Sequence, residues 1–318
     1  MKPLTTTTIG SFPLPPGIEE FKRSLKLQVE AGVDYPALPQ LEDFCEIFLR
    51  DIAERGKGLK RQGEQYVLVG PIEPPREPSI VQEAVLAINT LKEMGVQGRL
   101  KVQVTGPLTL SSLVKFLDKN ALAYPDIVES FADAIGEIVA CACSHEEVEV
   151  AFIDEPMTYY ALWSGYEDKF VVNCLNRALR KVPKGVERGI HICGDARGLH
   201  RVTLNLDVDV IHHEVAGSPQ NLDAYTPSNL VQSGKMLGIG VVTVKPLDER
   251  VRIEEVEEIE KLMVQAAEKY QGKVVFAPDC GFKGLLEALP IEQAVQVVYE
   301  KLSNMVKASA KLKERFAR

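Results

Sequence analysis

Short runs of β-branched and apolar residues alternate along the chain with longer segments of helical period, and this alternation restricts the fold more than any other feature. A strand, a helix and a second strand form a βαβ unit, and successive units build a parallel sheet. The runs predicted as strands are Thr5–Ile9, Tyr66–Val69, Leu100–Thr105, Val150–Asp154, Gly189–Cys193, Val208–His213, Gly238–Val244 and Val274–Ala277. The segments predicted as helices include Ile18–Ala31, Leu41–Arg55, Ile80–Met94, Ile127–Cys143 and Glu254–Tyr270.

The number of these units favours a closed barrel. About eight strand–helix units close a (β/α)8 barrel, and such barrels often contain about 250 residues or more as one domain. We therefore predict an α/β fold in which residues 1–318 form a single-domain (β/α)8 TIM barrel. An open doubly wound sheet is the main alternative, but the GxGxxG fingerprint and the GxxxxGK[ST] phosphate loop are both absent from the sequence.

Charge and hydropathy exclude several classes of partner. The formal net charge is −8, whereas nucleic-acid-binding domains usually carry a net positive charge. No apolar run approaches the ~20 residues of a membrane span, and no apolar segment behind a basic start marks a secretion signal. We therefore expect a soluble cytoplasmic protein without nucleic-acid or membrane partners. Its six scattered cysteines are expected to be free thiols or metal ligands rather than disulfides.

The ends of the predicted strands are rich in residues that can carry chemistry. In strand order these ends read IGS (9–11), GPI (70–72), TGP (105–107), DEP (154–156), HICG (191–194), HHE (212–214), VKP (244–246) and PDCG (278–281). The carboxyl ends of all strands in a TIM barrel meet at one mouth, where the active sites of such enzymes lie. This coincidence predicts an enzyme with its site at the barrel mouth.

One histidine, two cysteines and one glutamate at these ends form a candidate zinc site. His191 and Cys193 are two residues apart on one predicted strand, so both side chains point to the same side. Glu214 and Cys280 follow the sixth and eighth predicted strands. This donor set suits tetrahedral zinc, because thiolates select against magnesium and calcium. The alternative is that Cys193 and Cys280 are small buried core residues, as free cysteines often are.

Two adjacent carboxylates, Asp154 and Glu155, follow the fourth predicted strand. Adjacent acids at a barrel mouth can hold an ammonium group or share a proton, so both are candidates for substrate binding. The alternative, which applies more to Glu155, is that one of them caps the next helix. His212 and His213 flank Glu214, and one of them is a candidate for facing the same site.

Six motifs, in this order, resemble the catalytic carboxyl-terminal barrel of the cobalamin-independent methionine synthases. They are TTTTIGSFP (5–13), VTGPLTL (104–110), FIDEP (152–156), HICG (191–194), DVIHHE (209–214) and PDCGFK (278–283). The resemblance implies a zinc ion and a methyl transfer to homocysteine, whose thiol the metal would convert to a nucleophilic thiolate. The zinc ligands that it implies are His191, Cys193, Glu214 and Cys280.

The same resemblance implies which residues bind the amino-acid part of homocysteine: Ile9, Gly10, Ser11, Gln40, Asp154 and Glu155. The segment 9–11 would bind the carboxylate end, with Gly10 allowing close backbone approach, and Asp154 would contact the amine. Gln40 stands where the longer enzymes have a further acid. Its amide can accept from an ammonium group without contributing charge, and the nearby Glu42 and Asp43 are candidates to replace that acid.

Several departures from the family pattern concern the methyl donor. The tryptophan that stacks on the pterin of methyl-folate is replaced by the stretch SSLV (111–114), and an Arg-Cys pair that reaches the folate is replaced by GPIEPPRE (70–77). Lys245 occupies the place of the family's proton-donating histidine. A leaving folate nitrogen needs a proton, whereas a departing Co(I) does not. The resemblance is therefore to the short, archaeal type of methionine synthase, which implies a methyl-corrinoid donor: methylcobalamin or a corrinoid protein.

Three alternatives remain open at the level of sequence. The barrel and zinc could serve another thiol such as coenzyme M, the donor could be methyl-folate after all, or the chain could be a zinc protein that only docks corrinoid carriers. The basic run RGKGLKRQG (55–63) is either a solvated loop or a docking patch for an acidic corrinoid protein.

Overall fold

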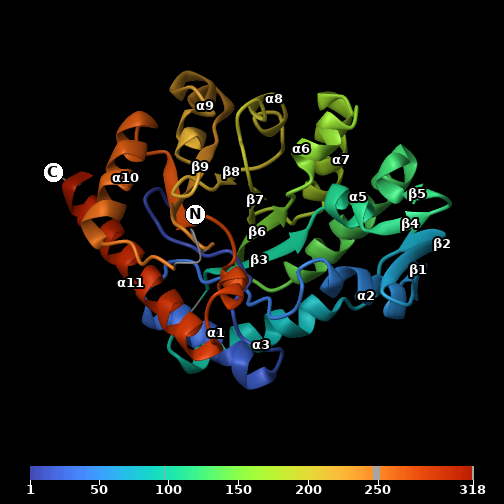
Figure 1. The fold of residues 1–318 in the computed structure, drawn as a ribbon, viewed down its shortest axis with the longest axis horizontal. Helices are drawn as coiled ribbons and strands as arrows, with labels where there is room; N and C mark the ends of the chain where they lie inside the picture. Colours follow the sequence, from blue (N-terminus) through green and yellow to red (C-terminus); the bar gives the residue numbers. More distant parts are fainter. Residues whose placement is uncertain (97, 246–250, 317–318) are drawn as a thin grey trace.

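A curled parallel sheet of six strands, in the order β10-β9-β8-β7-β6-β3, forms the centre of the molecule (Figure 1). The computed structural model describes residues 1–96, 98–245 and 251–316. The strands are β3 (Leu100–Thr105), β6 (Val148–Asp154), β7 (Glu187–Ile192), β8 (Val210–His213), β9 (Met236–Val242) and β10 (Val274–Pro278). All neighbouring pairs are parallel, so the last six predicted strands are confirmed.

Two irregular segments close this sheet into a barrel. Residues 5–9, predicted as the first strand, lie beside β10, and residues 35–40 lie between them and β3. The parallel bridges join Thr6 to Phe276, Thr7 to Tyr35, Ser11 to Gln40 and Ala37 to Lys101. Pro36 and Pro39 interrupt the second segment, and because proline has no N–H to donate, the segment cannot form a continuous ladder. The eight positions of the predicted barrel are therefore filled.

The prediction that Tyr66–Val69 is the second barrel strand is wrong. This run belongs to β2 (Gln65–Glu73), which pairs antiparallel with β1 (Lys57–Gln62) in a separate sheet of order β1-β2-β4-β5. The short strands β4 (Val114–Phe116) and β5 (Lys119–Asn120) complete that sheet. The GPI motif therefore lies in the side sheet rather than at the end of a barrel strand. A two-residue turn with Gly63 at φ 62° joins β1 to β2, as expected for a hairpin.

Helices surround the barrel sheet (Figure 1). The α-helices are α1 (Ile18–Glu30), α2 (Glu46–Arg55), α3 (Ser79–Glu93), α4 (Pro107–Ser112), α5 (Pro125–Ala142), α6 (Thr158–Trp163), α7 (Asp168–Leu179), α8 (His200–Thr203), α9 (Pro227–Ser233), α10 (Val256–Lys269) and α11 (Ile291–Phe316). The five predicted helices are confirmed, although α2 starts five residues later than expected, where the Asp43 carboxylate accepts from the Cys45 and Glu46 N–H groups. None of the described helices is long and apolar enough to cross a membrane.

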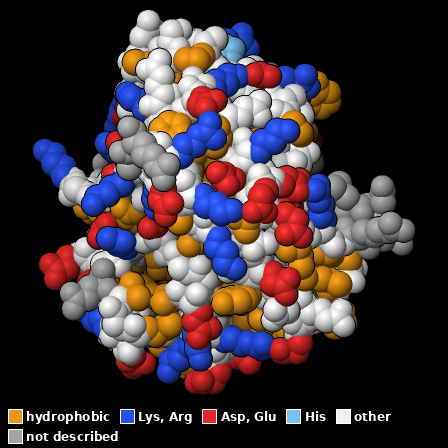
Figure 2. Space-filling model, turned by 90° about the vertical axis from the view of Figure 1, so that its left-hand side faces the viewer, with side chains coloured by type: hydrophobic (Ala, Val, Ile, Leu, Met, Phe, Trp, Pro, Cys, Tyr) orange, Lys and Arg blue, Asp and Glu red, His pale blue; other side chains and the backbone are white. Residues whose placement is uncertain are grey.

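Opposite charges cover the face formed by α10 and α11, on which Figure 2 shows Lys, Arg, Asp and Glu side chains interspersed. Lys311 of α11, for example, pairs with Glu257 of α10 at 2.9 Å. Beneath this surface, Lys301 and Glu254 form a buried ion pair at 2.6 Å. Exposed ion pairs such as Lys311–Glu257 contribute little stability. We interpret the face as a solvated surface with interspersed charges.

The barrel interior is apolar near the amino ends of the strands and polar above. Its lower part is an apolar cluster of Met1, Tyr35, Val150, Phe152, Val210 and Val275. On β3, the side chains of Lys101 and Gln103 point inward, because alternate residues of a barrel strand face the interior. Lys101 Nζ donates to the Thr8 carbonyl at 2.5 Å, and Gln103 Nε2 donates to the Leu38 carbonyl at 2.6 Å. The barrel interior below the mouth therefore contains polar side chains that form hydrogen bonds.

Replacing Gly189 with alanine should destabilise the barrel. A Cβ at this position on β7 would lie 2.1 Å from Phe152 Cε1, so the Phe152 ring would have to move. Overpacking of this kind costs about 1–3 kcal/mol, which a urea titration would measure as a lower free energy of unfolding. The control is Gly70→Ala on β2, where nothing lies within 4 Å of the new Cβ. Equal stability of both variants would contradict this account of the interior.

Candidate metal centre and substrate cavity

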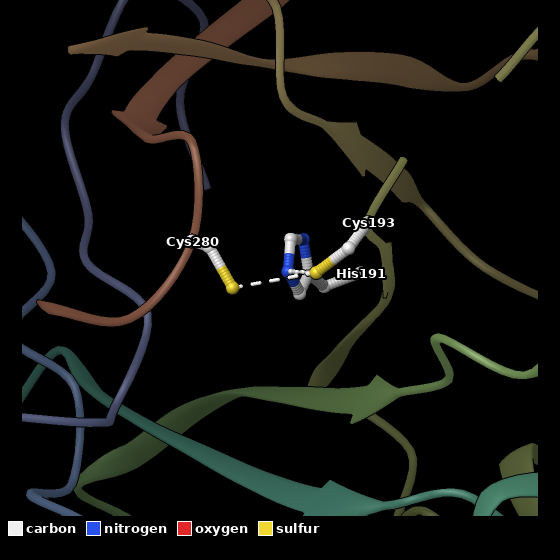
Figure 3. Close-up of side chains that lie close together, drawn as sticks. All are labelled: His191, Cys193 and Cys280. Atoms are coloured by element: carbon white, nitrogen blue, oxygen red, sulfur yellow. Dashed lines mark hydrogen bonds between the residues drawn. The ribbon is translucent and has the colours of Figure 1, made fainter. Parts of the chain in front are cut away.

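Three of the four predicted metal ligands come together at the barrel mouth. His191 lies near the end of β7, Cys193 follows directly after that strand, and Cys280 follows β10. The Cys193 sulfur lies 3.0 Å from His191 Nε2 and 3.3 Å from the Cys280 sulfur. One ligand atom from each residue lies within 4.8 Å of the others. Figure 3 shows the three side chains pointing toward one another from two different parts of the barrel.

The chemistry of this donor set fits zinc. Zinc bonds of about 2.0 Å to nitrogen and 2.3 Å to sulfur place two ligands of one ion roughly 3–4 Å apart, which is the spacing found here. The hydrogen bond between the two sulfurs lowers the pKa of Cys280 well below that of a free thiol and raises the pKa of Cys193. The lowered pKa favours the thiolate of Cys280, the form of cysteine that binds metals. The site therefore offers one imidazole nitrogen and two sulfurs to a metal ion.

Glu214, the fourth predicted ligand, lies directly after β8 but outside the group of three. Its carboxylate Oε1 accepts a hydrogen bond from Ser218 Oγ at 2.6 Å. The segment that follows it is held by Asp279, whose carboxylate accepts from three consecutive backbone N–H groups, those of residues 215 to 217, at 2.7–3.0 Å. The residue before Cys280 therefore fixes the loop that carries Glu214. The sequence offered no signal for this link, because it depends on β8, β9 and β10 lying side by side in the sheet.

A cavity of about 390 Å³ adjoins the three ligands. Predicted residues that line it, besides the ligands, are Ile9, Ser11, Gln40 and Asp154. The Asp154 carboxylate is 5% exposed, and its Oδ1 has no hydrogen-bond partner within the described chain. An unpartnered buried carboxylate oxygen is costly, so an arrangement of this kind points to a donor that the protein itself does not supply.

A buried lysine that the sequence did not single out influences Asp154. Burial raises the pKa of Asp154, while the charges of His191 and Lys101 oppose that rise. Lys101 is fully buried, and burial lowers its pKa to about 8. Its Nζ lies 4.4 Å from the centre of the Phe152 ring. Lys101 therefore provides positive charge beneath the carboxylate. Its only signal in the sequence was a charged residue inside the predicted strand Leu100–Thr105.

Glu155 serves the barrel rather than the cavity. It is fully buried, and its carboxylate accepts from the Leu108 and Thr109 N–H groups at 2.9 and 2.8 Å and from the Thr109 hydroxyl. These groups lie in the first turn of α4, where an acid stabilises unpaired N–H groups. A Cβ at Gly106 would lie 2.1 Å from Glu155 Oε2, so that glycine leaves room for the carboxylate. The placement supports the helix-capping alternative and does not support a substrate-binding role.

Replacing Glu155 with glutamine should therefore lower stability rather than substrate affinity. An amide can accept from one N–H group of α4 but presents its own N–H to the other, which leaves buried donors unsatisfied. The expected loss in the free energy of unfolding is about 1–3 kcal/mol, measured by chemical denaturation. The KM of the folded variant for homocysteine, the substrate expected from the sequence, should match that of the wild type. A raised KM with unchanged stability would show that Glu155 binds the substrate instead.

The other predicted substrate residues occupy distinct places. Gly10 accepts a hydrogen bond from the Gln40 N–H at 2.6 Å, and a Cβ on it would lie 1.8 Å from Gln103 Nε2. Gly10 thus permits close packing inside the barrel rather than forming the cavity wall. Glu42 lines the cavity but is paired with Arg50, whose hydrogen bonds lower the Glu42 pKa. Asp43 lines the cavity as well, and its Oδ1 accepts from the Cys45 and Glu46 N–H groups at the start of α2.

The structure also places the cysteines, Lys245, the basic run and the two histidines of the HHE motif. All six cysteines are free thiols, as expected. Lys245 lines the cavity and is exposed, whereas Pro246 of the VKP motif lies outside the described residues. The basic run 55–63 contains the whole of β1 in the side sheet, and its Lys57 and Arg61 pair with Glu73 and Glu46. His212 and His213 are both buried in β8.

Comparison with known proteins gives a consistent result. The family model described as the catalytic domain of the cobalamin-independent synthases matches residues 67–311. The methionine synthase of Methanocaldococcus jannaschii is 25% identical over 344 residues, covering 98% of this chain and 100% of that protein. The 5-methyltetrahydropteroyltriglutamate–homocysteine methyltransferase of Thermotoga maritima is 24% identical, and the alignment covers 98% of this chain but 45% of that protein.

A solved structure shows the same fold. A B12-independent methionine synthase from Shewanella sp. W3-18-1, determined in complex with selenomethionine, superposes with a TM-score of 0.75. The superposition covers 99% of each chain at 18% sequence identity. The predicted TIM barrel is therefore confirmed.

Proposed function

Because the chain belongs to the family of the cobalamin-independent methionine synthases and is an enzyme of that type, we propose that it transfers a methyl group to homocysteine at a zinc ion. The observation that carries the proposal is the adjacency of two features. The group of His191, Cys193 and Cys280 lies on the same cavity as the unpartnered oxygen of Asp154. An amino acid with a thiol side chain needs two such features: a metal ion that binds its sulfur and an anionic group that binds its ammonium group.

The roles of the residues follow from this placement. His191, Cys193 and Cys280 would hold zinc, with Glu214 proposed as the fourth ligand, and the metal would supply the lowered thiol pKa that makes a thiolate available at neutral pH. Asp154 would accept from the ammonium group. Ser11 and the backbone beside it would bind the carboxylate, since the Ser11 side chain lines the cavity. These contacts align the sulfur for direct displacement, so catalysis consists mainly of positioning and thiolate activation.

For the methyl donor, we propose a methyl-corrinoid rather than methyl-folate. A flat pterin binds against an aromatic face. Phe44 is an aromatic side chain that lines the cavity beside the metal site, but the only tryptophan, Trp163 on α6, is 77% exposed and does not line it. Lys245, at the place after β9, does line that cavity, whereas the transfer from folate would need a proton donor there. The ammonium of a lysine is a much weaker acid than an imidazolium. A cobalt-bound methyl group leaves without protonation, so a lysine in place of the histidine is compatible with that donor.

Methionine formation by the zinc-loaded protein, detected by mass, tests the proposal. Homocysteine would be offered with methylcobalamin in one reaction and methyl-tetrahydrofolate in another, and coenzyme M would replace homocysteine in a third. We expect methionine from methylcobalamin alone. Methionine from the folate would overturn the donor assignment. Faster methylation of coenzyme M than of homocysteine would overturn the acceptor, because coenzyme M has no ammonium group for Asp154.

A further inference from the structure

A second histidine contacts the metal ligand His191 from the neighbouring strand. His191 of β7 and His212 of β8 are Cα partners in the parallel ladder, and both side chains are 1% exposed. Their Nδ1 atoms lie 2.7 Å apart, with the two rings inclined at 50°. This contact is a hydrogen bond between two buried rings at the base of the metal site.

The two nitrogens of His191 have separate partners. Nε2 lies 3.0 Å from the Cys193 sulfur, on the side where the ligands converge, and Nδ1 faces His212. An imidazole that binds a metal through Nε2 carries its proton on Nδ1. That proton is then donated to Nδ1 of His212, which accepts as a neutral ring protonated on Nε2. With His191 protonated on Nδ1 and His212 protonated on Nε2, the hydrogen bond between the rings forms and Nε2 of His191 is free to bind a metal.

The position of the His212 ring is fixed by the next strand. Gly238 of β9 is the Cα partner of His212, and a Cβ on Gly238 would lie 2.8 Å from both Cβ and Cδ2 of His212. The missing side chain thus provides the space that the ring occupies. His212 Nε2 is buried and has no hydrogen-bond partner within the described chain. Among the described residues, the ring's only hydrogen bond is the one to His191.

We propose that His212 is a positioning residue that orients His191 and fixes its tautomer for metal binding. The inference rests on the proposed zinc centre and deepens it. Groups that accept from the second nitrogen of a ligating histidine typically raise metal affinity 10–100-fold. A neutral imidazole does so without adding negative charge beside two cysteine sulfurs, unlike the carboxylate that often occupies this position. The neighbouring His213 instead contacts the Ile192 carbonyl and the Tyr225 hydroxyl.

Two substitutions separate the hydrogen bond from simple packing. In His212→Asn, the amide Oδ1 is as many bonds from Cα as Nδ1 of histidine is, so it can still accept from His191. In His212→Leu, a methyl group takes that place and cannot accept. His213→Leu is the matched control, because it removes a buried imidazole one residue away that does not contact His191.

Zinc affinity, measured by competition with a chelator of known strength, is the readout. We expect His212→Leu to bind zinc about 10–100-fold more weakly than the wild type. His212→Asn should stay within a few-fold of the wild type, and His213→Leu should lower the Tm without weakening zinc binding. Absorption spectra of the cobalt-substituted proteins should shift for His212→Leu only.

The outcomes distinguish this inference from the proposed function. A wild-type protein that binds no zinc would overturn the metal centre and the inference with it. Tight binding by the wild type and equal binding by His212→Leu would overturn the inference alone. Equal weakening by the leucine and asparagine variants would show that ring shape, not hydrogen-bond acceptance, is what matters, and would also overturn it.

Discussion

Cys280→Ser should abolish stoichiometric zinc binding and lower methionine formation by more than about 100-fold, exceeding the 10–100-fold effects typical of residues behind a metal ligand. Cys280 supplies one of two sulfurs, and the hydrogen bond from Cys193 lowers its pKa. A serine hydroxyl of similar size stays protonated and is a poor zinc ligand. The measurement is metal content after dialysis, together with initial rate.

Cys141→Ser is the control for this change. Cys141 lies on α5, half-buried and away from the three clustered ligands, so its replacement should leave zinc content and rate unchanged. A Cys280→Ser protein that retained one zinc per chain and most of its activity would contradict the assignment of the site.

Asp154→Asn should raise the KM for homocysteine by about 30-fold or more, since losing one partner of a buried charge pair costs about 2–5 kcal/mol. The carboxylate oxygen that has no partner within the described protein would no longer carry charge for the ammonium group. Zinc content should remain at the wild-type level, which separates this effect from loss of the metal. A homocysteine KM equal to that of the wild type would show that Asp154 does not bind the amine.

The pH dependence provides a second test of Asp154. Burial raises its pKa, and the amine is bound only when the carboxylate is ionised. Affinity for homocysteine should therefore be highest above that raised pKa. It should fall as the pH drops toward and below the pKa, because the carboxylate is then protonated. This acid limb should disappear in Asp154→Asn, whose amide does not titrate. A limb that persists in the variant would belong to another group.

The clustering of His191, Cys193 and Cys280 was predictable because it depends on two simple regularities. Residues two apart on a strand share a face, which placed His191 beside Cys193. The carboxyl ends of barrel strands meet at one mouth, which brought Cys280 to them. The orientation of Glu214 was not accessible in this way, since its carboxylate bonds to Ser218 and its loop is held by Asp279.

The errors also have physical reasons. Strand propensity identified Tyr66–Val69 as a strand but could not say which sheet it joins, and it passed over residues 35–40 because Pro36 and Pro39 are poor strand formers. The hydrogen bonds of Glu155 were not predictable either, because its partners, the first N–H groups of α4, are distant in sequence. The contact between two histidines on β7 and β8 depends on strand register, which no local pattern specifies.

Proton release on binding homocysteine tests the central claim most directly. A free thiol of this kind has a pKa of about 8.5, so at pH 7 it must lose its proton to bind zinc as a thiolate. Calorimetry of the zinc-loaded protein, repeated in buffers of different ionisation enthalpy, should give about one proton released per homocysteine and none for homoserine. Equal proton release for the two ligands, or homocysteine binding that does not depend on zinc, would contradict the account.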